Sequence, residues 1–284
     1  MISDMDAAIP REDARSYGEP YVWRPTAERV DGANVTRLAR SAGVSGFSEL
    51  RARSVSDVEW YWDAAVRDLG LPFRTPYTRV LDISHGIERP DWFVGSTLNV
   101  VDACVGRWQG ESDRRRAAVI HEAEDGAVTT LTFGELAEQV ARAAGGLARL
   151  GVGCGDAVAL FLPMIPEAAV AKGAITATST VRRGKRIAMK TQLDEALDAC
   201  PSIEHVVVIG EGAAERAAHE IAWSDLLAGE GVSPVAVDAT EPLLLGYTSG
   251  TTGRPKGAVH THAGFLVKTA TEIAYSFDQS PGDV

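Results

Sequence analysis

Apolar residues recur at helical spacing between residues 133 and 150. They stand three and four positions apart, at Phe133, Leu136, Val140, Ala144, Leu147 and Leu150. This spacing predicts an amphipathic helix with one buried face. Thr132 and Glu135 have the spacing of a capping box, which places the start of the helix, and Gly151 provides a stop.

A second helix is predicted earlier in the chain, within an irregular and largely helical lead-in. Trp60 and Val66 lie on its apolar side, and Gly70 ends it. Ser56 and Glu59 again have capping-box spacing, in which the hydroxyl and the carboxylate satisfy amides of the first turn. We therefore expect this helix to begin at Ser56.

Continuous apolar runs predict buried strands at residues 157–162 and 204–209, because a strand covered on both faces shows no alternation. Helices are predicted at residues 166–175 and 190–200, so strands and helices alternate. Asp125-Gly126 is typical of a tight hairpin turn. The pattern predicts an α/β fold with a mostly parallel sheet flanked by helices.

Composition limits the class of partner. The chain has 284 residues, 45% of them hydrophobic, which suffices for one large domain or two modest ones. The formal net charge of -11 argues against a nucleic acid or an anionic membrane as partner, so an anionic ligand needs a local positive patch. The N-terminal residues do not resemble a signal peptide, and Pro163, Pro166 and Glu167 interrupt the most apolar stretch. We expect a cytoplasmic protein.

The most informative motif is the string YTSGTTGRPKG at residues 247–257. Glycines allow positive φ and a close approach of the backbone to a ligand, and they stand at Gly250, Gly253 and Gly257. Hydroxyl donors stand beside them at Thr248, Ser249, Thr251 and Thr252. Lys256 adds a compact positive charge, so the string predicts a loop that binds phosphate groups.

A Walker P-loop is the obvious alternative, and its spacing is absent. Counting from Gly250, Pro255 stands where the second glycine belongs, and Gly257 follows Lys256 in place of a serine or threonine. Residues 258–262 then form a short β-like run, whereas a Walker loop opens directly into a helix.

The same string closely resembles the signature of the AMP-forming acyl-CoA synthetases and their adenylate-forming relatives. The resemblance implies that the loop wraps the β- and γ-phosphates of ATP, bound with Mg²⁺, while a carboxylate attacks the α-phosphate. It also implies the adenylate-forming fold. Trp92-Phe93-Val94-Gly95 followed by Leu98-Asn99 resembles a signature of the acetyl- and propionyl-CoA synthetase branch. Ordinary aromatic packing is the alternative explanation for these residues.

Arg182, Arg183, Lys185 and Arg186 form a basic cluster in an otherwise acidic chain. By the same resemblance, Arg182 and Lys185 fall where acetyl-CoA synthetases contact the phosphates of the CoA nucleotide, and charge attraction is the physical reason. A solvated basic loop is the alternative.

The family pattern breaks between Ala168 and Arg182, where a segment of roughly forty residues, about one βαβ unit, is missing by comparison. A sheet that loses a strand exposes apolar edge, so we expect poor packing here. The family's Y-G-x-T-E and T-G-D segments and its lysine-bearing C-terminal domain are also not found in the sequence. We expect a lead-in region at 1–110 and a partial AMP-binding domain at 111–284.

No metal site is predicted. The three cysteines lack metal-like or disulfide-like spacing, and His260 and His262, which would share a face of a strand, have no third ligand nearby in sequence. Hydrogen bonding behind the phosphate loop is the preferred role for these two histidines.

The predicted function is that of an AMP-forming synthetase converting a short-chain carboxylate, ATP and CoA to acyl-CoA, AMP and diphosphate. The sequence as given is expected to lack turnover because residues that act as a unit are missing. The alternatives are a non-catalytic nucleotide-binding remnant, an interaction protein, or an adenylation domain that loads a carrier protein.

Overall fold

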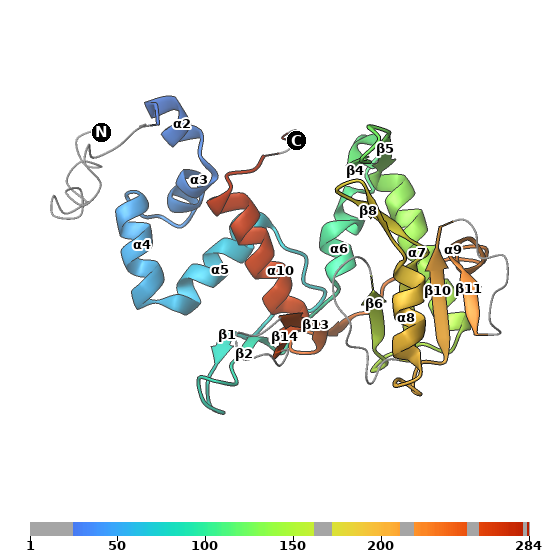
Figure 1. Ribbon diagram of the computed structural model, residues 1–284. Helices are drawn as coiled ribbons and strands as arrows, with labels where there is room; N and C mark the ends of the chain where they lie inside the picture. Colours follow the sequence, from blue (N-terminus) through green and yellow to red (C-terminus); the bar gives the residue numbers. More distant parts are fainter. Residues whose placement is uncertain (1–24, 162–171, 211–218, 249–255, 281–282, 284) are drawn as a thin grey trace, which may run out of the picture. The chain divides into compact units, whose positions relative to one another are not determined.

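The computed structural model describes residues 25–161, 172–210, 219–248, 256–280 and 283. By spatial contacts the chain forms two compact units (Figure 1). Unit 1 comprises Met1–Val100, Ala236–Leu245 and Val259–Val284, and unit 2 comprises Val101–Val235 and Gly246–Ala258. Among the described residues, no helix has the length and apolar character needed to cross a membrane.

Unit 2 contains a four-stranded parallel sheet in the order β11-β10-β7-β6. Its strands are β6 (Val158–Phe161), β7 (Gly173–Ala177), β10 (His205–Ile209) and β11 (Glu220–Ala222). The strands predicted at 157–162 and 204–209 are therefore confirmed, and so is the parallel α/β arrangement.

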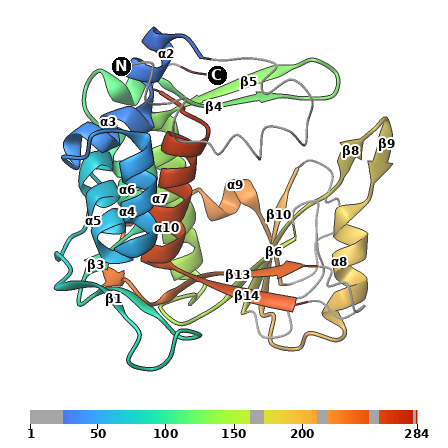
Figure 2. The ribbon, with the colours of Figure 1, turned by 90° about the vertical axis from the view of Figure 1, so that its left-hand side faces the viewer.

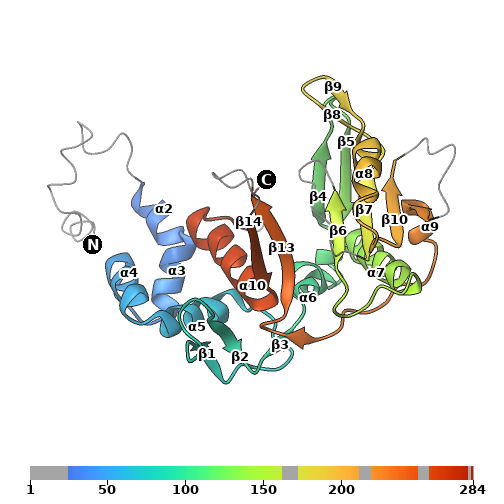
Figure 3. The same ribbon diagram turned by 60° about the horizontal axis from the view of Figure 1, so that its bottom comes forward.

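Helices cover both faces of this sheet (Figure 3). They pack on alternate residues of the same strands. On one face, Ala174 and Val206 pack against Leu193 of α8 (Met189–Leu197). On the other face, Ile175 and Val207 pack with α7 (Phe133–Arg149) and α9 (Trp223–Leu226). Successive residues of a strand point to opposite faces, so a strand buried between two helical layers has to be apolar throughout.

Strand β7 corrects two sequence-based expectations. Residues 173–175 were predicted to end a helix at 166–175, but they form the first part of β7. Residues 162–171 lie outside the described part of the chain. The region is also better packed than predicted, because β6 and β10 pair with β7 on its two sides and Ala174 and Thr176 are almost fully buried. Apolar exposure is seen on the edge strand β6, where Leu160 is 59% exposed, and at Val181 of the following hairpin.

The remaining elements of unit 2 follow the local sequence signals. The capping box of Thr132 and Glu135 opens α7 as predicted, with both hydrogen bonds present. The hairpin of β4 (Ala117–Glu122) and β5 (Val128–Thr132) turns at Gly126, where φ is 82°. Short helices α6 (Val100–Cys104), η2 (Gly106–Trp108) and η3 (Asp113–Arg115) precede it.

Unit 1 is mainly helical. The helices are α2 (Ala27–Gly32), α3 (Asn34–Ser41), α4 (Phe47–Ser56), α5 (Val58–Leu69) and α10 (His262–Thr271), which continues into the π-helix η4 (Glu272–Ser276). Figure 2 shows α10 running alongside α5, and η4 contacts α3. Short strands complete the unit, namely β1 (Arg79–Asp82), β2 (Asp91–Val94), β3 (Thr97–Leu98) and β12 (Val237–Asp238).

The capping box predicted at Ser56 is wrong. The N-cap of α5 is Asp57, whose carboxylate accepts a hydrogen bond from the Trp60 amide at 3.1 Å. Ser56 is the last residue of α4, and its hydroxyl donates to the Arg53 carbonyl. The predicted stop is confirmed, because Gly70 has left-handed φ and ψ at the C-cap.

A buried carboxylate joins the N-terminal helices of unit 1 to the segment that follows α10. Asp68 is 5% exposed and accepts hydrogen bonds from Arg37 at 3.0 Å, Tyr275 at 2.7 Å and Ser41 at 3.1 Å. Burial raises the pKa of Asp68, but these donors outweigh burial and hold the pKa below its ordinary value. Burial and the neighbouring carboxylate raise the pKa of Tyr275.

Candidate functional site

The predicted phosphate-binding string lies between two paired strands, β13 (Pro242–Thr248) and β14 (Lys256–Thr261). Thr248 ends β13 and Lys256 begins β14, so the structure brings the two ends of the loop together. The connection is too short for a crossover between parallel strands, so the pair is an antiparallel hairpin. The other predicted residues, Ser249, Gly250, Thr251, Thr252 and Gly253, lie outside the described part of the chain.

Gly257 has a different role from the one predicted. It lies in β14 and is not among the glycines with positive φ. A Cβ atom at this position would lie 3.0 Å from the Tyr247 ring. The glycine therefore makes room for Tyr247, which stands across the hairpin close to the start of the loop.

The structure that follows the loop excludes the Walker alternative, because the chain enters strand β14 and not a helix. Helix α10 begins only afterwards, where the Thr261 hydroxyl accepts a hydrogen bond from the Gly264 amide at 3.3 Å. The hairpin thus leads directly into α10, whose buried face includes Ala263, Leu266 and Val267. Packing of this helix fixes the C-terminal end of β14.

His260 and His262 do not share a strand face, contrary to expectation. His260 is an exposed residue of β14 whose ring meets Phe265 edge-on, whereas His262 is the first residue of α10. Among the residues that the structure describes, none hydrogen-bonds the buried Nδ1 atom of His262, and burial lowers the pKa of the imidazole. Within the described residues, no group of three or more His, Cys, Asp or Glu side chains is arranged to hold a metal ion.

The basic cluster forms a second hairpin, in unit 2. Strands β8 (Thr180–Arg182) and β9 (Lys185–Ile187) are antiparallel, and their register makes Arg182 and Lys185 direct cross-strand partners. The turn consists of Arg183 and Gly184, with φ of 53° and 72°. Two residues with positive φ are what a tight hairpin of this type requires.

An acidic residue that the sequence analysis did not single out contacts this basic turn. Glu124, in the turn between β4 and β5, accepts hydrogen bonds from the backbone amides of Arg183 at 2.7 Å and Gly184 at 3.1 Å. The side chains of Lys185 and Arg186 in β9 are exposed. The Asp125-Gly126 signal predicted the turn that carries Glu124, but no local signal connects it with residues some sixty positions later.

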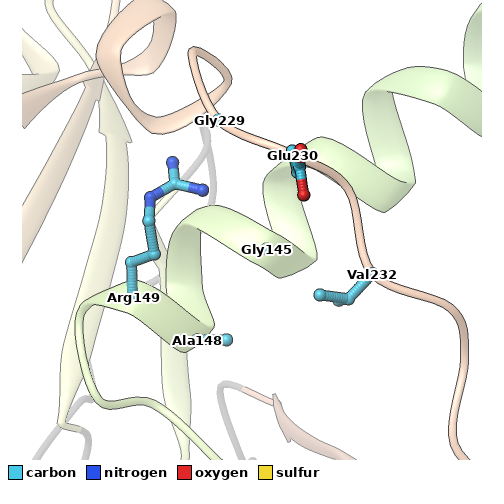
Figure 4. Close-up of a pocket in the computed structure, with 6 residues that line it drawn as sticks. All are labelled: Gly145, Ala148, Arg149, Gly229, Glu230 and Val232. Carbon is cyan, nitrogen blue, oxygen red and sulfur yellow. The ribbon is translucent and has the colours of Figure 1, made fainter.

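A pocket of about 500 Å³ in unit 2 contains none of the predicted site residues (Figure 4). It lies between α7 and the segment after α9, and its lining is Gly145, Ala148, Arg149, Gly229, Glu230 and Val232. Arg149 donates a hydrogen bond to the Leu226 carbonyl at 2.9 Å, which joins the end of α9 to α7.

The layered parallel sheet, the helical N-terminal unit and the hydroxyl-rich string between paired strands together define an α/β protein of the adenylate-forming acyl-CoA synthetase class. The family model described as "AMP-binding enzyme" matches residues 106–182 and 172–284, and one described as "Acetyl-coenzyme A synthetase N-terminus" matches residues 47–104. The chain belongs to the AMP-binding enzyme family.

Its relatives include proteins named acetyl-coenzyme A synthetase. The one from Laribacter hongkongensis is 35% identical over 87% of this chain and 43% of its own length. The one from Streptomyces coelicolor is 33% identical over 91% of this chain and 43% of its own length. Among solved structures, acetoacetyl-CoA synthetase from Streptomyces lividans matches with a TM-score of 0.81 and 28% identity, over 92% of this chain and 46% of that one. The chain thus spans less than half the length of these relatives.

The alignments also support the predicted internal break. The family model matches in two separate segments, which overlap at residues 172–182. The Laribacter comparison runs over 286 positions, but 87% of 284 residues is about 247, so about 39 positions of the alignment have no residue of this chain. The structure closes the sheet directly at this place, because β6 before the break pairs with β7 after it.

Proposed function

We propose that this chain provides the binding sites for the ATP phosphates and the CoA nucleotide in an AMP-forming acyl-CoA synthetase reaction. The observation that supports this most directly is the β13–β14 hairpin, which pairs the two ends of the glycine- and hydroxyl-rich string and presents the exposed Lys256. The substrates would be a short-chain carboxylate, Mg-ATP and CoA. Magnesium would be bound together with ATP. At a nucleotide, Mg²⁺ is held mainly by the phosphates and by water, and it needs only one or two protein carboxylates.

The proposed reaction has two steps. In the first, a carboxylate oxygen attacks the α-phosphorus of ATP, the bond from the α-phosphorus to the bridging oxygen breaks, and diphosphate leaves. In the second, the CoA thiol loses its proton, its sulfur attacks the acyl carbon, and AMP leaves. Lys256 and the hydroxyls of the string would stabilise the charge that develops on the departing diphosphate.

Titration calorimetry with Mg-ATP tests the first binding site. Lys256→Ala is expected to weaken ATP binding about tenfold, because one charge-assisted contact is lost. Lys268→Ala is the matched control, since Lys268 is an exposed lysine of α10 that pairs with Glu272. Absence of ATP binding by the unsubstituted chain, or equal affinities for the two variants, would contradict the assignment.

The polypeptide of residues 1–284 is expected to bind these ligands without completing the reaction alone. It spans 43% of the Laribacter relative, and residues that act as a unit lose activity out of proportion when some are absent. Acyl-CoA formed from acetate or propionate by the purified polypeptide would refute this expectation. A cytoplasmic location stays a prediction, which cell fractionation checks.

A further inference from the structure

The contact of Glu124 with the basic turn is unusual in its chemistry. A carboxylate that meets a basic turn could pair with its side chains, but both oxygens of Glu124 accept hydrogen bonds from backbone amides. One oxygen accepts from the Arg183 amide at 2.7 Å, and the other accepts from the Gly184 amide at 3.1 Å. Such charge-assisted hydrogen bonds are about twice as strong as neutral ones.

The turn needs such an external partner. Arg183 has a left-handed φ of 53°, which residues other than glycine seldom adopt, and this conformation persists only where the surroundings enforce it. The hairpin has only three residues in each strand, so its own cross-strand hydrogen bonds provide little rigidity. The carboxylate of Glu124 holds both amides of the turn and fixes the hairpin to the turn between β4 and β5.

The contact fixes the backbone positions from which the basic residues extend. Arg182 and Lys185 flank the two clamped residues in the chain and are direct cross-strand partners. A rigid turn keeps these two positions together without any ligand, whereas a loose turn loses conformational entropy each time an anion binds. In an acidic chain, a fixed local patch is the means by which an anionic ligand can be attracted.

We propose that Glu124 is a positioning residue for the basic turn, and that it prearranges Arg182 and Lys185 to bind a terminal phosphate of the CoA nucleotide. This inference rests on the proposed function, because that function supplies the ligand. Glu124 itself does not contact the ligand. Its carboxylate keeps its negative charge, but the two amide N–H dipoles point at its oxygens and offset part of its field at the bound phosphate.

The test compares CoA with dephospho-CoA, which lacks only the 3′-phosphate, by calorimetry on the whole 284-residue chain. The unsubstituted chain is expected to bind CoA more tightly, by a factor on the order of five, as for an exposed charge contact. Glu124→Ala is expected to reduce this preference to about twofold or less while leaving dephospho-CoA binding nearly unchanged. Glu124→Gln keeps an oxygen acceptor at the same reach and is expected to retain more of the preference than Glu124→Ala.

Glu122→Ala is the matched control, because Glu122 is an exposed residue at the end of β4 whose loss changes the net charge equally. If Glu124 acted only by repelling anions, Glu124→Ala would strengthen CoA binding, and that result overturns the inference. An unchanged preference in Glu124→Ala also overturns it.

Amide hydrogen exchange separates failure of the inference from failure of the proposed function. Exchange at Arg183 and Gly184 is expected to accelerate in Glu124→Ala and not in Glu122→Ala. Equal exchange in the two variants overturns the positioning role whatever ligand binds. If the unsubstituted chain shows no preference for CoA over dephospho-CoA, the CoA assignment and the inference both fail, whereas the ATP assignment is tested independently with Lys256→Ala.

Discussion

Replacing a glycine inside a helix with alanine usually stabilises a protein. At two adjacent glycines of α7, the same replacement should destabilise it. A Cβ atom at Gly145 would lie 2.2 Å from the Glu230 carbonyl oxygen, and one at Gly146 would lie 2.3 Å from the Leu226 carbonyl oxygen. Both contacts are with backbone, so a side-chain rotation cannot relieve them. The two glycines thus let the segment after α9 lie directly on the helix that covers the sheet.

The size of the effect follows from two opposing terms. In an ordinary helix position, replacing glycine with alanine stabilises by about 0.8–1 kcal/mol. Overpacking that forces the backbone to shift costs about 1–3 kcal/mol. For Gly145→Ala the contact falls so far below a normal separation that the upper part of this range applies. We expect a net loss of about 1–2 kcal/mol in the free energy of unfolding.

Urea unfolding followed by circular dichroism measures this change. Gly32→Ala in α2 is the control, because nothing lies within 4 Å of a Cβ atom built there, and it is expected to be neutral or slightly stabilising. If Gly145→Ala raised the free energy of unfolding as an exposed helical position would, the close approach of residues 226–231 to α7 would be refuted.

Three further predictions concern single side chains. Asp57→Ala is expected to cost about 1 kcal/mol in the free energy of unfolding, whereas Ser56→Ala costs close to nothing, because Asp57 caps α5; equal costs in urea unfolding would contradict this. The lowered pKa of Asp68 means that its ionised form stabilises the fold above the ordinary pKa of about 3.9, and that this stabilisation is lost as pH falls through the folded-state pKa. Asp68→Asn should therefore lower the melting temperature near neutral pH and reduce its fall below about pH 4, as measured by thermal unfolding at a series of pH values. An unchanged fall in melting temperature below pH 4 would contradict the role given to the Asp68 hydrogen bonds. Gly257→Ala is expected to displace Tyr247 and weaken Mg-ATP binding several-fold, about 1 kcal/mol, with the fold retained by circular dichroism; unaltered affinity would separate this glycine from the site.

Local signals in the sequence predicted much of unit 2. Three local signals agree with the tertiary structure, namely the capping box at Thr132, the turn at Gly126 and the β-branched run of β10. Each could therefore be predicted without knowledge of the rest of the fold. Strand β7 was not predictable in this way. Its residues, Gly173 to Ala177, are mostly small and follow a helix-like stretch, and they form a strand because β6 and β10 pair with them on both sides.

The sequence likewise predicted some residues of the candidate site and not others. Lys256 and the residues around it are recognisable because they form a continuous string. The role of Glu124 depends on a contact between two turns distant in sequence, and the role of Gly257 depends on a ring across the hairpin. Neither contact leaves a periodic or local pattern, so only the folded chain reveals it.

Whether residues 247–257 bind the phosphates of ATP can be measured by hydrogen–deuterium exchange of the whole chain with and without Mg-ATP, with Lys256→Ala in parallel. Slower exchange is expected in peptides that cover residues 247–257, with most of this protection lost in Lys256→Ala. Protection confined to other segments, or none at ATP concentrations that saturate related enzymes, would contradict the phosphate-binding assignment.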